Sequence, residues 1–335
     1  MKKTFLSVCA LCAGLAFAAE PVKVIFDTDM YTDYDDVGAL GILHVYADEG
    51  KAEILACGSC TWGEGNASVG AIEVINNYYG RGDIPVGGTD HGGIKGAGAR
   101  GFDLLKKYPN WFKYGNPKAA PKAVDVYLEA LRKAPDASVT FITVGFLNNA
   151  ADLVKADRDL VAKKVKLWVA MACAYPDGKE CNSMHDPAAS DYALTHWPTP
   201  IIFTDFQLGR WLFAGRRAAE LPSEGPNPIR DVFRKMLQPR SRVVPLGTPG
   251  KRATWDQLAG HPSWDETAVV IAVEGWQKWF NLERGTFKMV GGKGADVWVP
   301  DPKSPNGRVT EKVPRQEVGV HLDDLMCRPP KTPGK

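Results

Sequence analysis

The sequence predicts an α/β fold: a mostly parallel, Rossmann-like sheet with helices on both of its faces. Short apolar runs that are typical of buried strands alternate with longer stretches of helical periodicity, and this alternation favours a parallel sheet. The expected strands occupy residues 22–26, 53–57, 84–86, 139–144, 165–171 and 201–204. Ligands of such sheets bind outside the carboxyl ends of the strands, so the residues that follow each strand are the functional candidates.

Each expected element has a local reason in the sequence. The first strand, Val-Lys-Val-Ile-Phe, is an apolar run that ends in a polar loop, and a helical stretch with apolar positions follows at residues 37–46. Further helices are expected at residues 71–79, at 119–134, where prolines bound the stretch, and after Asn148.

The last part of the chain changes character. Residues 268–280 predict a helix, 286–290 and 296–299 predict a small hairpin, and 300–314 predict a proline-rich loop. We expect residues 280–335 to form a C-terminal hairpin and tail that belong to the main domain.

The first 18 residues are typical of a Sec-type signal peptide. Lys2 and Lys3 precede a short apolar run, and small residues stand before the expected cleavage site. We therefore expect export to the periplasm or the medium, with residues 19–335 as a single mature domain. The apolar run is too short to span a bilayer, and no later segment is long and apolar enough, so no membrane partner is expected after cleavage.

Overall charge gives a negative result. The 335 residues carry 41 basic and 39 acidic side chains, a formal charge of +2. Removal of residues 1–18 takes away two lysines and leaves 39 charges of each sign, so the mature chain is formally neutral. Nucleic-acid-binding domains carry a basic excess, so this balance argues against a nucleic-acid partner.

The mature chain keeps five cysteines. They are Cys57, Cys60, Cys173, Cys181 and Cys327. An exported protein meets an oxidising compartment, so either a Cys57–Cys60 or a Cys173–Cys181 disulfide could form. The odd number of cysteines leaves at least one thiol without a partner in its own chain. A zinc site at Cys57-x-x-Cys60 is disfavoured because the chain has no second pair of this kind.

The most distinctive feature is a cluster of acidic residues after the first strand. Asp27, Asp29, Asp33, Asp35 and Asp36 place five carboxylates within ten residues. Like charges this close repel one another unless protons or a cation compensate them. Hard oxygen ligands favour calcium or magnesium over zinc. The alternative is a solvated acidic loop that caps the next helix, but so many acids beside a buried strand are costly without a function.

The acidic run resembles the N-terminal motif of the inosine-uridine-preferring nucleoside hydrolase family, which is Asp-x-Asp, a short turn and Asp-Asp-Ala-x-Ala-Leu. Here it reads Asp27-Thr-Asp29 and then Asp35-Asp36-Val-Gly-Ala-Leu40, and the longer turn between them is similar to that of secreted bacterial members. Further matches follow in order up to about residue 280. They are Gly65-Asn66, Gly145–Ala150, Met171, Glu180-Cys-Asn182, Asp186–Ala189, Thr199–Gly209 and Trp255-Asp256-Gln-Leu-Ala259.

The resemblance implies a nucleoside hydrolase fold and a hydrolase of the N-glycosidic bond of ribonucleosides, acting in purine or pyrimidine salvage. It implies a Ca²⁺ ion that orients the ribose diol and lowers the pKa of a bound water. The implied metal ligands are Asp29, Asp36, Asn148 through its backbone carbonyl, and Asp256. Asp29 is also the implied general base.

The same resemblance assigns the small-molecule contacts. The implied substrate-binding residues are Asp35, Asn66, Met171, Glu180 and Asn182, with Glu180 at the 5′ end of the ribose. Asp27 is expected to support the metal ligands from behind. A homodimer or homotetramer is implied by the resemblance alone.

The leaving-group side departs from the family pattern. Members that protonate the departing base often use a His directly before the last Asp, and Trp255 stands at that position here. His91, the nearest His by loop position, and Trp255 are therefore the candidate contacts to the base.

Two alternatives remain open. The departure at Trp255 motivates a protein of the same fold that binds a ribosyl ligand with little turnover. A haloacid-dehalogenase-type phosphatase is more remote: its strand-Asp-x-Asp start matches Asp27-Thr-Asp29, but Tyr31 stands where that family has Thr or Val.

Overall fold

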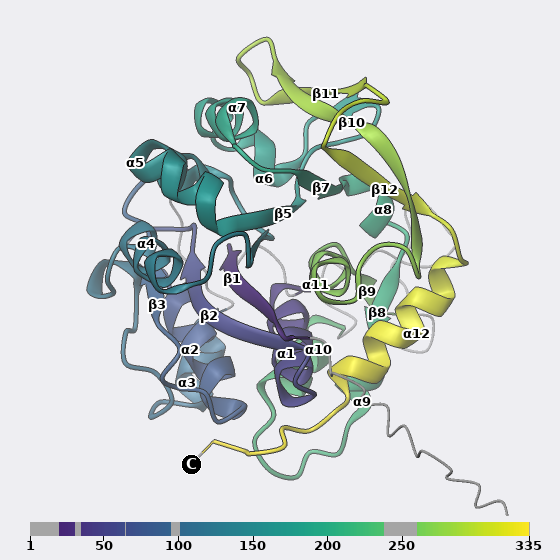
Figure 1. The fold of residues 1–335 in the computed structure, drawn as a ribbon. Coiled ribbons are helices and arrows are strands. Elements are labelled where there is room, and N and C mark those ends of the chain that lie inside the picture. The colour runs from purple at the N-terminus through teal and green to yellow at the C-terminus, as the bar shows by residue number, and fades with distance from the viewer. Residues whose placement is uncertain (1–19, 31–34, 64, 95–100, 238–259, 335) are drawn as a thin grey trace, which may run out of the picture.

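The computed structural model describes residues 20–30, 35–63, 65–94, 101–237 and 260–334. Within them the main feature is a ten-stranded sheet of order β3-β2-β1-β4-β5-β7-β12-β10-β11-β6 (Figure 1). The first six strands in this order are parallel, as the sequence predicts. In chain order, β1, β2, β3, β4, β5 and β7 span Val22–Thr28, Ala52–Ser59, Val86–Gly88, Val139–Thr143, Val165–Met171 and Ile201–Thr204.

Helices cover both faces of the sheet, and each face has its own hydrophobic cluster. Val24 and Phe26 of β1 belong to one cluster and Ile25 to the other, which is the alternation of a strand buried on both sides. One face carries α1 (Asp35–Asp48), α2 (Ser68–Tyr78), α3 (Gly101–Lys107), α10 (Pro228–Met236) and α11 (Asp265–Glu274). The other carries α4 (Ala123–Lys133), α5 (Asn148–Lys164) and α7 (Pro187–His196).

Shorter elements connect these layers. They are the 3-10 turn Pro117–Ala119, β6 (Asp177–Gly178), α6 (Cys181–Met184), α8 (Phe206–Gly209), β8 (Phe213–Gly215), α9 (Arg216–Glu220) and β9 (Gly260–Pro262). β8 and β9 pair in a separate two-stranded sheet. The helix expected over 119–134 begins only at Ala123, because Ala120 precedes Pro121 and is extended.

The C-terminal part continues the main sheet. β10 (Phe280–Val290) and β11 (Ala295–Pro300) form the expected hairpin, with positive φ at Gly291 and Gly292 in its turn. The expectation of a plain loop over 300–314 is wrong, because β12 (Gly307–Glu311) pairs with both β7 and β10. Prolines on either side of this short strand hid it from the sequence pattern.

Two helices near the C-terminus also differ from expectation. α11 lies earlier than the predicted 268–280 and ends at Gly275, whose φ is +79°. α12 (Arg315–Met326) was not predicted, and it packs against α1 beside the last residues of the chain (Figure 1). Its apolar face is formed by residues such as Val318 and Leu322, which are too few to stand out in a polar stretch.

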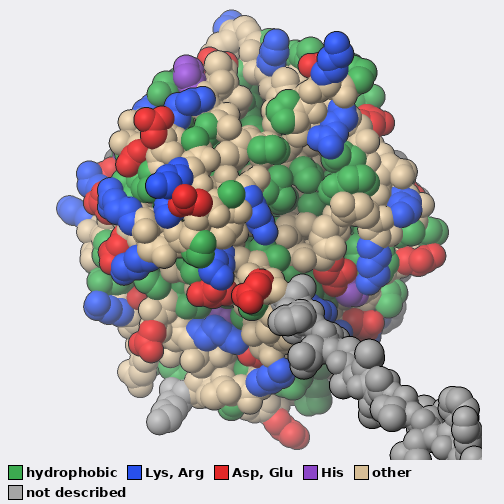
Figure 2. Space-filling model, in the orientation of Figure 1, with side chains coloured by type: hydrophobic (Ala, Val, Ile, Leu, Met, Phe, Trp, Pro, Cys, Tyr) green, Lys and Arg blue, Asp and Glu red, His purple; other side chains and the backbone are tan. Residues whose placement is uncertain are grey.

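Other sequence expectations can be compared with the described residues. Neither the Cys57–Cys60 nor the Cys173–Cys181 disulfide is formed, and no two of the five described cysteines are joined by a disulfide. None of the described helices has the length and apolar character needed to cross a membrane. On the face shown in Figure 2, basic and acidic side chains are interspersed. The predicted signal peptide lies outside the described residues.

Candidate active site

The first part of the candidate site lies at the carboxyl end of β1. Asp27 and Asp29 are both buried there, and between them Thr28 donates its hydroxyl proton to Asp36 in the first turn of α1. Thr28 Oγ1 also accepts the Met30 N–H at 3.0 Å. These bonds tie the end of the strand to the start of the helix, as expected for a site outside the carboxyl ends of parallel strands.

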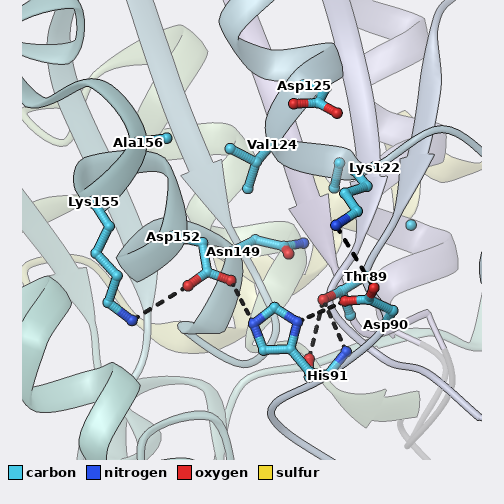
Figure 3. Close-up of a pocket in the computed structure, with 12 residues that line it drawn as sticks. Thr89, Asp90, His91, Lys122, Val124, Asp125, Asn149, Asp152, Lys155 and Ala156 are labelled. Atoms are coloured by element: carbon cyan, nitrogen blue, oxygen red, sulfur yellow. Dashed lines mark hydrogen bonds and ion pairs between the residues drawn. The ribbon is translucent and has the colours of Figure 1, made fainter.

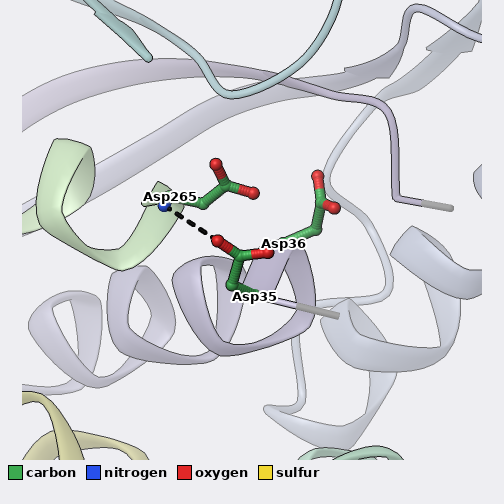
Figure 4. A group of neighbouring side chains, drawn as sticks. All are labelled: Asp35, Asp36 and Asp265. Atoms are coloured by element: carbon green, nitrogen blue, oxygen red, sulfur yellow. Dashed lines mark hydrogen bonds between the residues drawn. The ribbon is translucent and has the colours of Figure 1, made fainter. Parts of the chain in front are cut away.

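A second chain segment completes an acidic cluster. Asp35 and Asp36 form the first turn of α1, and Asp265 begins α11, which packs against α1 (Figure 4). One carboxylate oxygen of each of these three residues lies within 4.8 Å of the others, and all three side chains are buried. Two helix N-termini thus place partial positive charge beside the acids.

The donor set fits a hard divalent cation. Three buried carboxylates so close together repel one another unless a cation or protons compensate them. Carboxylate, carbonyl and water oxygens are the ligands that Ca²⁺ and Mg²⁺ prefer, and Ca²⁺ accepts six to eight of them. Among the described residues, these three are the one group of acidic, His or Cys side chains placed to share a metal ion.

Asn148 adds a buried oxygen beside this region. The turn from β4 to α5 lies against β1, and a Cβ on Gly145 would stand 2.5 Å from the Asp29 nitrogen, so the close approach requires glycine. Asn148 Nδ2 donates to the carbonyls of Cys60 at 3.2 Å and His91 at 3.0 Å. Its buried Oδ1 has no hydrogen-bond partner among the described residues. This oxygen is therefore available to a cation or to a hydrogen-bond donor of a ligand.

A cavity of about 250 Å³ opens beside the acids. Its polar lining residues are Asp29, Asp35, Glu180, Asn182 and Asp265, and its other lining residues are Val144, Met171, Cys181, Phe206 and Trp264. Five of the residues that the sequence assigned to metal or substrate therefore line one space. Phe206 and Trp264 stack with ring centroids 5.7 Å apart, and Trp264 Nε1 donates to the Phe206 carbonyl at 2.9 Å. The lining of the cavity therefore combines acidic and aromatic side chains.

Glu180 is held by backbone groups at the start of α6. Its Oε1 accepts the Asn182 N–H at 2.9 Å, and its Oε2 accepts the N–H groups of Cys173 and Ser183, each at 3.1 Å. Burial raises the pKa of Glu180 to about 7, although these three hydrogen bonds oppose the rise. Asn182 Nδ2 in turn donates to the Met171 carbonyl at 3.0 Å.

Asp27 lies behind the cavity. Its Oδ1 accepts hydrogen bonds from the Tyr127 hydroxyl at 2.5 Å and from Asn149 Nδ2 at 2.7 Å, and burial raises its pKa to about 7. It does not line the cavity, so its position agrees with a supporting role for the end of β1.

Asn66 is also buried but does not line the described cavity. Its Oδ1 accepts the Ser68 N–H at 2.9 Å and its Nδ2 donates to Thr61 Oγ1 at 3.0 Å. These bonds organise the start of α2, and a contact between Asn66 and substrate remains a prediction.

His91 lines a different cavity, of about 340 Å³ (Figure 3). Its Nδ1 lies 2.7 Å from Asp90 and its Nε2 lies 2.9 Å from Asp152. The hydrogen bond to Asp90, together with the charge of Asp152, raises the pKa of His91. The imidazole thus links the loop after β3 to α5, and its assignment to the leaving group stays a prediction.

Asp265 and Trp264 are site residues that the sequence reasoning missed. Trp255, Asp256 and Asp33, which it named, lie outside the described residues. The pattern Trp-Asp-x-x-Ala occurs twice, at 255–259 and at 264–268. The second copy leads into an uninterrupted apolar run, which is the signal that a buried helix starts there.

Comparisons with known proteins give the family and the shared fold. The sequence profile of the family described as inosine-uridine preferring nucleoside hydrolase matches residues 24–323. No curated protein matches the chain by sequence.

Three solved structures illustrate the shared fold. A plant nucleoside hydrolase is 19% identical, with a TM-score of 0.65 and coverage of 92% of this chain and 100% of that one. An inosine-uridine preferring nucleoside hydrolase from Bacillus anthracis is 16% identical, with a TM-score of 0.67 and coverage of 92% and 99%. The type III effector protein XopQ, solved with adenosine diphosphate ribose, is 17% identical, with a TM-score of 0.67 and coverage of 92% and 93%.

Proposed function

Because the chain belongs to the inosine-uridine preferring nucleoside hydrolase family, we propose that it is a calcium-dependent nucleoside N-ribohydrolase that uses Asp29 as general base. Membership itself makes the chain an N-glycosyl hydrolase of nucleosides. The metal, the base and the ligand set are the added proposal. The observation that carries it is the buried cluster of Asp35, Asp36 and Asp265, two of which line the cavity together with Asp29.

The proposed ligands are Asp29, Asp36, Asn148 and Asp265. We assign the last position to Asp265 in place of Asp256, because an oxygen of Asp265 lies within 4.8 Å of oxygens of Asp35 and Asp36. When bound, a calcium ion would orient the ribose diol and make an attacking water more acidic. The chemistry of the donor set, all hard oxygens, supports this choice.

The chain's own residues perform the remaining work. Water attacks the anomeric carbon as the bond to the base breaks, and the sugar passes through an oxocarbenium-like state. Asp29 takes the proton of that water. The carboxylates of Asp35 and Asp265 stabilise the positive charge that develops on the ribose. Asn182 and Glu180, which line the same cavity, hold ribose hydroxyls, and the Phe206–Trp264 pair packs against the departing base.

A second candidate function rests on Trp264. The position directly before the metal-binding Asp is Trp in both copies of the pattern, so the family's frequent His donor is missing from it. A protein of this fold that binds a ribosyl ligand with little turnover would tolerate that replacement.

One assay separates these functions. The mature chain, residues 19–335, is incubated with inosine, uridine or a nitrophenyl riboside, with and without a chelator. Release of ribose that disappears with the chelator supports the hydrolase. Tight binding of ribosides without release supports the binding protein. Release of phosphate from phosphomonoesters alone would contradict both and favour the phosphatase alternative.

We also propose that the chain is exported and that residues 1–18 are removed. The basic start, the short apolar run and the small residues before Ala19 support this. The mass of the protein recovered from the periplasm or the medium tests the cleavage site, and gel filtration of the same sample tests for the homodimer or homotetramer.

A further inference from the structure

The C-terminal hairpin contacts the loop that carries Glu180 and Asn182. This loop leads from the end of β5 to α6, and Figure 1 shows the β10–β11 hairpin beside α6 and α7. β11 pairs with β6 inside the loop, with Asp296 opposite Gly178, and Trp298 N–H donates to the Pro176 carbonyl at 2.9 Å. The hairpin therefore extends the sheet and also supports a wall of the cavity.

Asp296 makes the polar part of this contact. Its side chain is fully buried. Its Oδ1 accepts the Ala174 N–H at 2.9 Å, and its Oδ2 lies 3.1 Å from the Ser183 hydroxyl. Ala174 lies near the start of the loop, and Ser183 lies in α6, the helix that follows the loop. One carboxylate therefore joins the two ends of the loop.

Glu180 binds Cys173, the neighbour of Ala174, and also Ser183. Its Oε2 accepts the N–H groups of Cys173 and Ser183. The successive N–H groups of Cys173 and Ala174 thus go to two different carboxylates, and Cys173 adopts a φ of +72°, which is rare for a residue other than glycine. A strained backbone of this kind persists only where surrounding contacts hold it. Glu180 and Asp296 supply such contacts to the N–H groups of Cys173 and Ala174.

Arg308 provides a further link between the C-terminal strands and this loop. Its guanidinium carbon lies 3.3 Å from the centre of the Tyr175 ring, and it forms ion pairs with Asp205 at 3.0 Å and Glu283 at 2.7 Å. Burial of Asp296 is costly, and it raises the pKa of that carboxyl to about 6. An apolar side chain at this position would avoid the cost of burying a carboxylate. What the aspartate adds are its hydrogen bonds with Ala174 and Ser183.

We propose that Asp296 is a positioning residue for recognition of the ribose 5′ end: through Ala174 and Ser183 it holds the loop in the geometry that aims Glu180 at the sugar. This inference rests on the proposed function, in which Glu180 contacts the 5′-hydroxyl group.

The test compares two substrates that differ only at that hydroxyl group. Values of kcat and KM for inosine and 5′-deoxyinosine are measured with the wild type, Asp296→Ala and Asp296→Asn. In Asp296→Ala, kcat/KM for inosine is expected to fall by about tenfold or more, mainly through KM, with little change for 5′-deoxyinosine. Asp296→Asn keeps an acceptor for the Ala174 N–H and is expected to retain most of the wild-type value.

Asp301→Ala is the matched control, since Asp301 lies just past the end of the same strand, is exposed, and its carboxylate accepts the Lys303 N–H at 2.9 Å within its own turn. It is expected to behave as the wild type with both substrates. If Asp296→Ala does not fold, Ser183→Ala removes one of the two hydrogen bonds and is measured with the same pair of substrates.

An equal fall for both substrates, or no fall for either, would overturn the proposal. A wild type that hydrolyses no riboside would instead contradict the proposed function. In that case, calorimetry measures the affinities of the wild type and the variants for ribose and for 5-deoxyribose, which differ only at the 5-hydroxyl group. A loss of affinity in Asp296→Ala that is confined to ribose supports the positioning role, and an equal loss for both sugars contradicts it.

Discussion

Asp35 accepts the backbone N–H of Asp265 across 230 residues of chain, with 3.2 Å between its Oδ2 and the Asp265 nitrogen. The same oxygen accepts the Trp264 N–H at 3.0 Å. One carboxylate in the first turn of α1 therefore caps the start of α11. Because this cap fixes the backbone at Asp265, it also fixes the point from which the Asp265 side chain extends toward the cluster.

Replacement of Asp265 by Asn is expected to weaken calcium binding. The substitution keeps the size of the side chain and the backbone N–H that Asp35 accepts, but it removes one of three clustered charges. Even groups that only support metal ligands cost about 10–100-fold in affinity when they are removed, so a loss of at least that size is expected. Calorimetric titration of the metal-free protein with calcium measures it, and ribose release should fall in parallel.

The matched control is Asp256→Asn. Asp256 is the Asp of the first copy of the Trp-Asp-x-x-Ala pattern, and Asp265 is the Asp of the second copy and the first residue of α11. Wild-type calcium affinity in Asp256→Asn together with weak binding in Asp265→Asn supports the assignment. The reverse pattern would return the ligand to Asp256.

Asp29→Asn tests the general base. Asn cannot take a proton from water, and loss of a positioned base typically costs about 10²–10⁴-fold in rate. Asn still offers an oxygen to a metal ion and to ribose, so ribose binding should be kept in part. Stopped assays of inosine hydrolysis give kcat, and calorimetry with ribose gives the affinity. Turnover near the wild-type value would remove Asp29 from this role.

Much of the fold could be predicted because its strands are simple apolar runs. The strands at 165–171 and 201–204 were predicted with the bounds that the structure shows. β12 could not be predicted in the same way, because a five-residue strand with Arg and Thr between prolines depends on its neighbours β7 and β10 for pairing.

The site was predictable where spacing along the chain was short. Asp29, Asp35 and Asp36 follow one strand, and Glu180 and Asn182 follow another, so local sequence brings each group together. Asp265 was missed because its place depends on the packing of α11 against α1, a contact across most of the chain. The support of Glu180 by Asp296 is non-local for the same reason.

Glu180 is expected to make the fold less stable as pH rises. Its pKa is raised to about 7 in the folded chain, from 4.5 when unfolded. Between these values the folded state binds a proton that the unfolded state has released, so the free energy of unfolding falls as pH rises through this window. The cost is complete above pH 7 and amounts to at most about 3 kcal/mol.

Urea unfolding of wild type and Glu180→Gln in the presence of a chelator, from pH 4.5 to 7.5, measures this contribution. The variant has lost the titrating group, so its stability should fall less steeply across the window than that of the wild type. Parallel curves would show that Glu180 titrates near its ordinary pKa in the folded chain.

The aromatic residues that line the cavity, Phe206 and Trp264, predict that kcat depends strongly on the leaving group. Apart from the acidic residues, the described cavity lining offers one titratable side chain, the Cys181 thiol. If Asp265 is the metal ligand, as proposed, Trp264 takes the position where family members often have a His. A base that must be protonated as it departs should therefore react slowly, whereas nitrophenolate leaves without a proton. The expected result is a kcat for a nitrophenyl riboside that exceeds the kcat for inosine by at least about 10²-fold, the lower range of general-acid contributions.

His91→Ala should leave this ratio unchanged, because its imidazole lies between Asp90 and Asp152 in the other cavity. A selective loss of inosine hydrolysis in His91→Ala would instead identify that imidazole as the proton donor to the base.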